Sequence, residues 1–296
     1  MTPIPEHWTA GLPVITDGAW GTELQKRGLE PGACPDEWNL TFPERVAEVA
    51  RSYVDAGSRV VLTNTFRASP IALAAAGLIP QMRGINRAGV RISREEAGSK
   101  ALVFASLGPS GKLLAADELT EDEAYASFAA QAEALAEEHP DALLLETFAD
   151  LAESSIALRA ARATGLPVIV SFVFDSGRNK DRTMMGATPE QAAARMESEG
   201  ASAVGANCGV GIEAAASVCR RLRAATGLPV WMKPNAGLPE IKAGGTLSWP
   251  DDSESFCRGA EALANAGATF IGGCCGTGPP VIRALRSFID KRRSSS

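Results

Sequence analysis

One pattern repeats along the whole sequence. A short apolar run rich in β-branched residues leads into a turn rich in Gly, Asn and Thr, and a longer helical stretch rich in Ala, Glu and Arg follows. The apolar runs lack polar alternation, which indicates strands buried on both faces, as in a parallel sheet. The predicted strands are Val14 to Thr16, Val60 to Thr63, Leu102 to Ser106, Ala142 to Leu145, Val168 to Phe172, Ala203 to Ala206, Val230 to Lys233 and Thr269 to Gly272.

Helical stretches separate the predicted strands, and a last one follows the final strand. Glycines at positions 57, 165, 200, 227 and 267 stand where helix C-caps commonly need a left-handed residue. The predicted helices cover residues 43–56, 82–98, 121–138, 151–164, 189–199, 212–226, 252–266 and 279–289.

Eight successive strand–helix units without a linker predict an α/β fold, a closed (β/α)8 TIM barrel. A length of 296 residues also permits two average domains, but no composition change marks a boundary. We therefore expect a single domain over residues 1–296, with its core at about 11–290. A doubly wound open sheet is the alternative, disfavoured because no G-x-G-x-x-G motif follows the first strand.

The charge and hydropathy patterns limit the kinds of partner that are expected. The net charge is −6, and Lys and Arg are scattered among Asp and Glu, which argues against a nucleic-acid partner. No apolar stretch of about 18 residues runs without a charge, and the N-terminus lacks a basic segment followed by an apolar one. We expect no membrane association and a cytoplasmic location.

Three of the six cysteines stand at the ends of predicted strands. Cys208 follows the run 203–206, and Cys274 and Cys275 follow the run 269–272. In a barrel these strand ends meet at one face, so the three thiols are expected to form a soft-metal site, with zinc as the metal. A tightly packed barrel end or a vicinal disulfide is the alternative.

The remaining cysteines and the histidines are not expected in this site. Cys34 lies in a loop, and Cys219 and Cys257 lie in predicted helices, where a small buried thiol is ordinary. His7 and His139 stand at no strand end, and a hydrolytic zinc site would usually contain histidine. Three thiolates give a zinc complex a charge of about −1, which keeps an incoming thiol electron-rich and suits it to alkylation.

Six motifs follow the predicted strands and span most of the chain. They are Asp17-Gly18-Ala19-Trp20-Gly21-Thr22, Thr63-Asn64-Thr65-Phe66, Leu145-Glu146-Thr147, Gly205-Ala206-Asn207-Cys208, Pro234-Asn235-Ala236-Gly237 and Gly272-Gly273-Cys274-Cys275-Gly276-Thr277. Together they resemble the zinc-dependent homocysteine S-methyltransferase family. Within it, the chain looks most similar to the homocysteine-binding module of cobalamin-dependent methionine synthase, as a stand-alone chain.

The resemblance implies specific roles. Cys208, Cys274 and Cys275 match the family's zinc ligands, through which catalysis would run. Asp17 and Glu146 match positions that hold the amino group of homocysteine, and the amides of Gly18 and Ala19 would meet its carboxylate. For Asp17 a turn cap is the alternative, and for Glu146 a structural pair with an Arg. A further polar shell would come from Thr65, Ser106 and Asn207, each of which could instead hydrogen-bond a loop.

The resemblance also implies the reaction. The protein would move a methyl group from an activated donor, either S-methylmethionine, another sulfonium or a betaine-type compound, to zinc-bound homocysteine thiolate, giving methionine. A methyl-corrinoid protein acting in trans is the alternative donor. Two other classes stay open: a non-catalytic zinc-thiolate protein, and a metal-free barrel lyase with two acid–base carboxylates. Aromatic residues that could face a cationic donor, or pack the barrel, are Trp20, Phe66, Phe148, Phe172 and Phe174.

Overall fold

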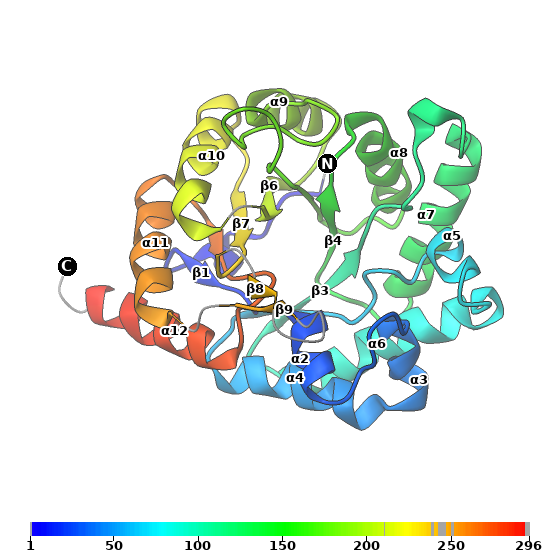
Figure 1. Ribbon diagram of the computed structural model, residues 1–296, viewed down its shortest axis with the longest axis horizontal. Helices are drawn as coiled ribbons and strands as arrows, with labels where there is room; N and C mark the ends of the chain where they lie inside the picture. Colours follow the sequence, from blue (N-terminus) through cyan, green and yellow to red (C-terminus); the bar gives the residue numbers. More distant parts are fainter. Residues whose placement is uncertain (1, 210, 238–239, 242–246, 250–251, 294–296) are drawn as a thin grey trace.

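The predicted barrel is confirmed by the computed structural model, which describes residues 2–209, 211–237, 240–241, 247–249 and 252–293. Eight parallel strands lie in the order β1-β10-β7-β6-β5-β4-β3-β2, and a bridge between Thr16 and Val60 joins the two ends (Figure 1). The strands are β1 (Val14–Ile15), β2 (Val60–Leu62), β3 (Leu102–Leu107), β4 (Ala142–Phe148), β5 (Val168–Phe172), β6 (Ala203–Cys208), β7 (Val230–Pro234) and β10 (Phe270–Ile271).

The predicted helices surround the barrel as an outer ring (Figure 1). Capping residues mark the ends of several of these helices. Thr120 and Thr188 form complete capping boxes at two N-termini, and Gly57, Gly165 and Gly267 have positive φ just after three C-termini. The ring consists of α4 (Pro43–Asp55), α6 (Met82–Ala97), α7 (Glu121–Ala136), α8 (Leu151–Arg162), α9 (Pro189–Ser198), α10 (Ile212–Ala225), α11 (Ser253–Asn265) and α12 (Pro279–Arg293).

Shorter elements were not predicted, because they are too brief to show a helical or strand period. The short helix α1 (Glu6–Thr9) packs Trp8 against Phe104 inside the barrel, with ring centroids 5.6 Å apart. The others are α2 (Trp20–Lys26), α3 (Trp38–Thr41), α5 (Pro70–Ala74), the 3-10 turns Pro35–Glu37, Ile79–Gln81 and Leu114–Ala116, and the antiparallel pair β8 (Glu240–Ile241) and β9 (Leu247–Ser248).

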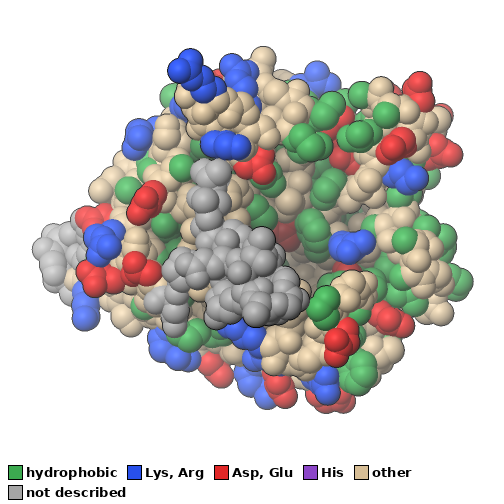
Figure 2. Space-filling model, viewed as in Figure 1, with side chains coloured by type: hydrophobic (Ala, Val, Ile, Leu, Met, Phe, Trp, Pro, Cys, Tyr) green, Lys and Arg blue, Asp and Glu red, His purple; other side chains and the backbone are tan. Residues whose placement is uncertain are grey.

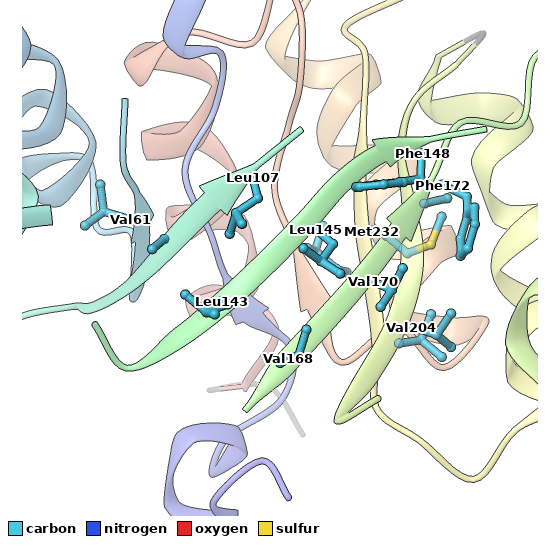
Figure 3. Close-up of a cluster of buried hydrophobic side chains, with 14 of the residues drawn as sticks. Val61, Leu107, Leu143, Leu145, Phe148, Val168, Val170, Phe172, Val204 and Met232 are labelled. Atoms are coloured by element: carbon cyan, nitrogen blue, oxygen red, sulfur yellow. The ribbon is translucent and has the colours of Figure 1, made fainter. Parts of the chain in front are cut away.

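Alternate residues of each strand face two different cores, because successive side chains of a strand point to opposite faces. The outer core lies between strands and helices and includes Leu143, Leu145 and Val170 (Figure 3). Phe148 and Phe172 also belong to this outer core, so they pack the barrel wall instead of facing a ligand (Figure 3).

The inner core changes from apolar to polar along the strands. The part nearer the amino ends of the strands is aromatic. There the ring centroid of Trp231 lies 5.9 Å from that of Phe104 and 5.4 Å from that of Phe270. Two residues further along their strands, the same face carries polar side chains. These are Ser106 after Phe104, Glu146 after Leu144, Ser171 after Ile169 and Lys233 after Trp231, all buried.

The outer surface mixes both charges. Lys and Arg side chains are interspersed with Asp and Glu on the face seen in Figure 2. None of the helices that the structure describes is long and apolar enough to cross a membrane.

Strands β6 and β7 pack closely at Gly205. A Cβ atom added there would lie 1.9 Å from the carbonyl oxygen of Trp231 on β7, so β6 and β7 leave no room for a side chain. We expect Gly205→Ala to lower the free energy of unfolding by about 1–3 kcal/mol or more, through overpacking. Gly21→Ala, with no atom within 4 Å of its added Cβ, is the matched control and should leave stability equal or higher. Urea denaturation of both variants measures this, and equal stability would contradict the packing account.

Candidate active site

A cavity of about 260 Å³ opens at the carboxyl end of the strands. Cys208, Cys274 and Cys275 line it, together with Glu146 and Lys233. We call it the thiol cavity. It is the place where the polar layer of the barrel interior meets the loops, so any molecule bound there faces thiols and buried charges together.

The structure brings the three thiols together. Their Sγ atoms all lie within 4.8 Å of one another, and the Cys208 and Cys274 sulfurs are 2.9 Å apart; none forms a disulfide. Tetrahedral zinc with Zn–S bonds of about 2.3 Å needs sulfurs about 3.8 Å apart, a spacing that these distances bracket. The residues therefore fit a three-thiolate metal site in the lining of the cavity.

Close backbone packing sets the position of Cys274 and Cys275. Gly272 precedes them at a point where an added Cβ would lie 1.9 Å from Thr16 Oγ1, so only glycine lets β10 approach β1 here. The Cys274 N–H then donates to the Pro234 carbonyl (2.8 Å), and the Cys275 carbonyl accepts from the Ala236 N–H (3.0 Å). These bonds tie the cysteine turn to the end of β7.

Cys208 reaches the same point from β6 with a left-handed backbone (φ 56°). The preceding residue, Asn207, is buried and braces this strand end. Its Oδ1 accepts from the Thr147 N–H (2.9 Å) and the Ser171 hydroxyl (2.7 Å), and its Nδ2 donates to Thr147 Oγ1 (2.7 Å). Thr147 also has positive φ (69°), an unfavourable state for a β-branched residue, so Asn207 fixes both strand ends beside the thiols.

Hydrogen bonds among the crowded thiols shift the pKa values of Cys208 and Cys275 in opposite directions. Hydrogen bonds from Cys208 and Cys274 lower the pKa of Cys275 to about 3. Hydrogen bonds to Cys274 and Cys275, together with burial, raise the pKa of Cys208 well above its ordinary value. Three thiolates this close together would repel one another, so a bound cation would favour ionisation of all three.

Glu146 presents a carboxylate to the cavity. Its Oε1 accepts a 2.5 Å hydrogen bond from the buried Ser106 hydroxyl. Burial raises the pKa of Glu146 to about 7. The nearby Lys233 cation opposes that shift, and no arginine is bonded to the carboxylate among the described residues. A second positive charge, such as a substrate ammonium group, would favour the ionised carboxylate.

Asp17 is buried and already rich in donors. Its carboxylate accepts from the Lys233 ammonium, from Trp20 Nε1 (2.7 Å) and from the Leu62 N–H (2.8 Å). A carboxylate offers about four acceptor positions, so three of them are taken within the protein. Asp17 joins β1, β2 and β7 behind the wall of the thiol cavity.

Lys233 is the site residue that the sequence interpretation missed. It is buried, lines the thiol cavity and forms an ion pair with Asp17. Burial alone would lower its pKa, but the Asp17 and Glu146 carboxylates raise it, so the side chain stays an ammonium. The signal was present: Lys233 stands two residues after the inward-facing Trp231, on the same strand face.

The remaining expected residues divide into two groups. Gly18 and Ala19 line the thiol cavity, although the Ala19 N–H donates to the Thr277 carbonyl (2.9 Å). Ser106 and Asn207 lie behind the wall, with the hydrogen bonds given above, and Thr65 Oγ1 donates to the Ser106 carbonyl (2.7 Å). Of the aromatic candidates, Trp20 and Phe66 line the cavity, whereas Phe148, Phe172 and Phe174 belong to the outer core.

Known proteins resemble the chain over nearly its whole length. The profile described as homocysteine S-methyltransferase matches residues 14–289. Betaine–homocysteine S-methyltransferase 1 of Mus musculus is 30% identical, over 98% of this chain and 75% of its own. Methionine synthase of Mycobacterium leprae is 29% identical over 93% of this chain and 24% of its own, so the chain spans about a quarter of that relative's length.

A solved structure shows the same fold. The metallated form of the homocysteine methyltransferase MmuM from Escherichia coli superposes with a TM-score of 0.77. The two sequences are 24% identical, and the match covers 93% of this chain and 95% of that chain.

Asp36, in the wall of the thiol cavity, gives a pH prediction. Burial raises its pKa from 3.8 to about 6, so ionising it costs more in the folded than in the unfolded state. The stabilisation is present below pH of about 4 and is lost as the pH rises through about 6. We expect the unfolding free energy of Asp36→Asn, relative to the parent, to rise by about 2–3 kcal/mol from pH 4 to 7. Denaturation across this range measures it, and parallel pH profiles would contradict it.

Proposed function

The chain belongs to the homocysteine S-methyltransferase family, and from this premise we propose that it methylates homocysteine to methionine. The methyl group would come from an activated small donor: S-methylmethionine, another sulfonium or a betaine-type compound. The observation that carries this proposal is the meeting of three thiols that form no disulfide, within 4.8 Å of one another, at a cavity that also holds a carboxylate and an ammonium.

We propose Cys208, Cys274 and Cys275 as the ligands of a zinc ion. The spacing of their sulfurs and the absence of histidine from the cavity lining support a soft, all-thiolate site. Zinc bound there would lower the pKa of an incoming thiol, which otherwise lies near 8.5, so that it reacts as thiolate near neutral pH. A reducing cytoplasm, the proposed location, would keep the three thiols free.

The chain's own residues would orient the substrate. Glu146 is proposed to accept the homocysteine ammonium, because one of its carboxylate oxygens is held by Ser106 and the other has no partner among the described residues. Asp17 adds negative charge from behind the wall. With the amino-acid end fixed, the sulfur is held towards the donor's methyl carbon, and alignment lowers the barrier without a general base.

Two aromatic residues mark where the donor would lie. Trp20 and Phe66 both line the thiol cavity, and Trp20 is held in place by its hydrogen bond to Asp17. Aromatic faces attract sulfonium and quaternary ammonium groups, which supports a small onium donor. A methyl-corrinoid protein remains the second candidate donor, since the chain resembles part of methionine synthase.

The direct test is formation of methionine by the zinc-loaded protein. Homocysteine is supplied with S-methylmethionine, betaine, dimethylsulfoniopropionate or methylcobalamin in parallel, and methionine is detected by mass spectrometry. We expect product from one donor, and Cys275→Ala should abolish both product and the binding of about one zinc per chain. Cys219→Ala, which removes a buried thiol within α10, is the matched control and should keep both. Full zinc content in Cys275→Ala would refute the ligand assignment.

A second test separates catalysis from metal storage. Glu146→Gln removes the charge proposed to hold the ammonium group but keeps the shape and the Ser106 contact. We expect the KM for homocysteine to rise about 10- to 100-fold, as for a lost charged hydrogen bond, with zinc content unchanged. Steady-state kinetics and metal analysis measure the two effects. A protein that only stores zinc would show no homocysteine-dependent difference between the variants.

A further inference from the structure

We propose that Lys233 is a specificity-determining residue, whose ammonium group binds the carboxylate of the acceptor amino acid. The inference rests on the proposed function and deepens it. The thiol cavity would then bind both charged groups of an amino-acid thiol: Glu146 would bind the ammonium group and Lys233 the carboxylate.

The first support is the donor capacity of Lys233. An ammonium group has three N–H donors, and among the described residues only Asp17 accepts one of them. The Lys233 side chain is nonetheless only 3% exposed and lines the thiol cavity. A buried ammonium with unused donors at a cavity wall favours an anionic ligand, because unpaired buried donors cost free energy.

The second support is that several neighbouring donors are already used. The Ala19 N–H donates to the Thr277 carbonyl, Trp20 Nε1 donates to Asp17, and the Thr147 N–H donates to Asn207. Of the two amides expected to meet the substrate carboxylate, the Ala19 N–H is therefore taken, and the Gly18 N–H has no acceptor among the described residues. Lys233 would add a charged donor beside the Gly18 amide.

The third support is charge arrangement. Asp17 accepts three hydrogen bonds from the protein and fixes Lys233, so Asp17 acts as a positioning residue. Glu146 lines the cavity and is close enough to Lys233 for each to shift the other's pKa. One negative and one positive group at the same wall match a zwitterionic amino-acid end, whose two charges then need no other partner.

If Lys233 instead takes the place of the substrate ammonium, its removal should change thiol binding in the opposite direction. If Lys233 only occupied the place of the substrate ammonium beside Asp17, its removal would free Asp17 and tighten binding of any amino thiol. If it bound the carboxylate, its removal would weaken binding only of thiols that carry one. Homocysteine and 3-aminopropanethiol, which differ by the carboxylate alone, separate the two cases.

The experiment is calorimetric titration of the zinc-loaded protein with each thiol, which requires no methyl donor. For Lys233→Met we expect the Kd of homocysteine to rise at least about tenfold, and that of 3-aminopropanethiol to change less than about twofold. Because Lys233→Met leaves Asp17 buried without its cation, the pair is also removed together in Asp17→Asn/Lys233→Met, which should show the same selectivity loss.

Arg67→Met is the matched control, since Arg67 is the other cation that lines the cavity among the described residues and is exposed. It should leave the ratio of the two Kd values unchanged. Equal losses for both thiols, tighter binding or an unchanged ratio in both Lys233 variants would overturn the proposal. Failure of the parent protein to bind homocysteine would overturn the proposed function itself, whereas homocysteine binding with an unchanged ratio would overturn only the role of Lys233.

Discussion

The closed barrel gives its interior only one side chain in two along each strand, and this constraint organises the molecule. The lower interior positions carry Phe104, Trp231 and Phe270, which fill the centre with aromatic rings. The next interior positions are polar, so a solvent-poor aromatic floor lies directly beneath buried charges. Electrostatic interactions above that floor are stronger than in water, so a few groups there would suffice to orient a small substrate.

Burial forces these charges to compensate one another. Asp17 is paired with Lys233, and Glu146 lies near the same cation while the thiols lie close by. Isolated ions would cost several kcal/mol each in such a place, so the polar layer holds both signs. A metal cation at the thiols and a zwitterion at Glu146 and Lys233 both fit this balance. Substrate and metal would then complete the charge pattern of the folded protein.

Several polar residues behind the cavity wall hold the residues that line it. Asn207 holds Thr147 and the end of β6, Ser106 holds Glu146, and Thr65 holds the backbone of Ser106. Metal and substrate sites need such bracing, because ligands that can move lose affinity and alignment. Polar residues in these motifs thus brace the wall of the thiol cavity even where they do not face it.

The sequence by itself determined the barrel and the meeting of the thiols. Strand runs, glycine-marked helix ends and the position of Cys208, Cys274 and Cys275 after two strands are local features, and parallel strands bring their carboxyl ends to one face. The short helices before α4 lacked a readable period. Only the tertiary structure decided the partner of Asp17, because Lys233 lies 216 residues away and barrel closure alone brings them together. The use of the Ala19 amide and the raised pKa of Glu146 have the same origin, since both depend on what surrounds a group, not on its neighbours in sequence.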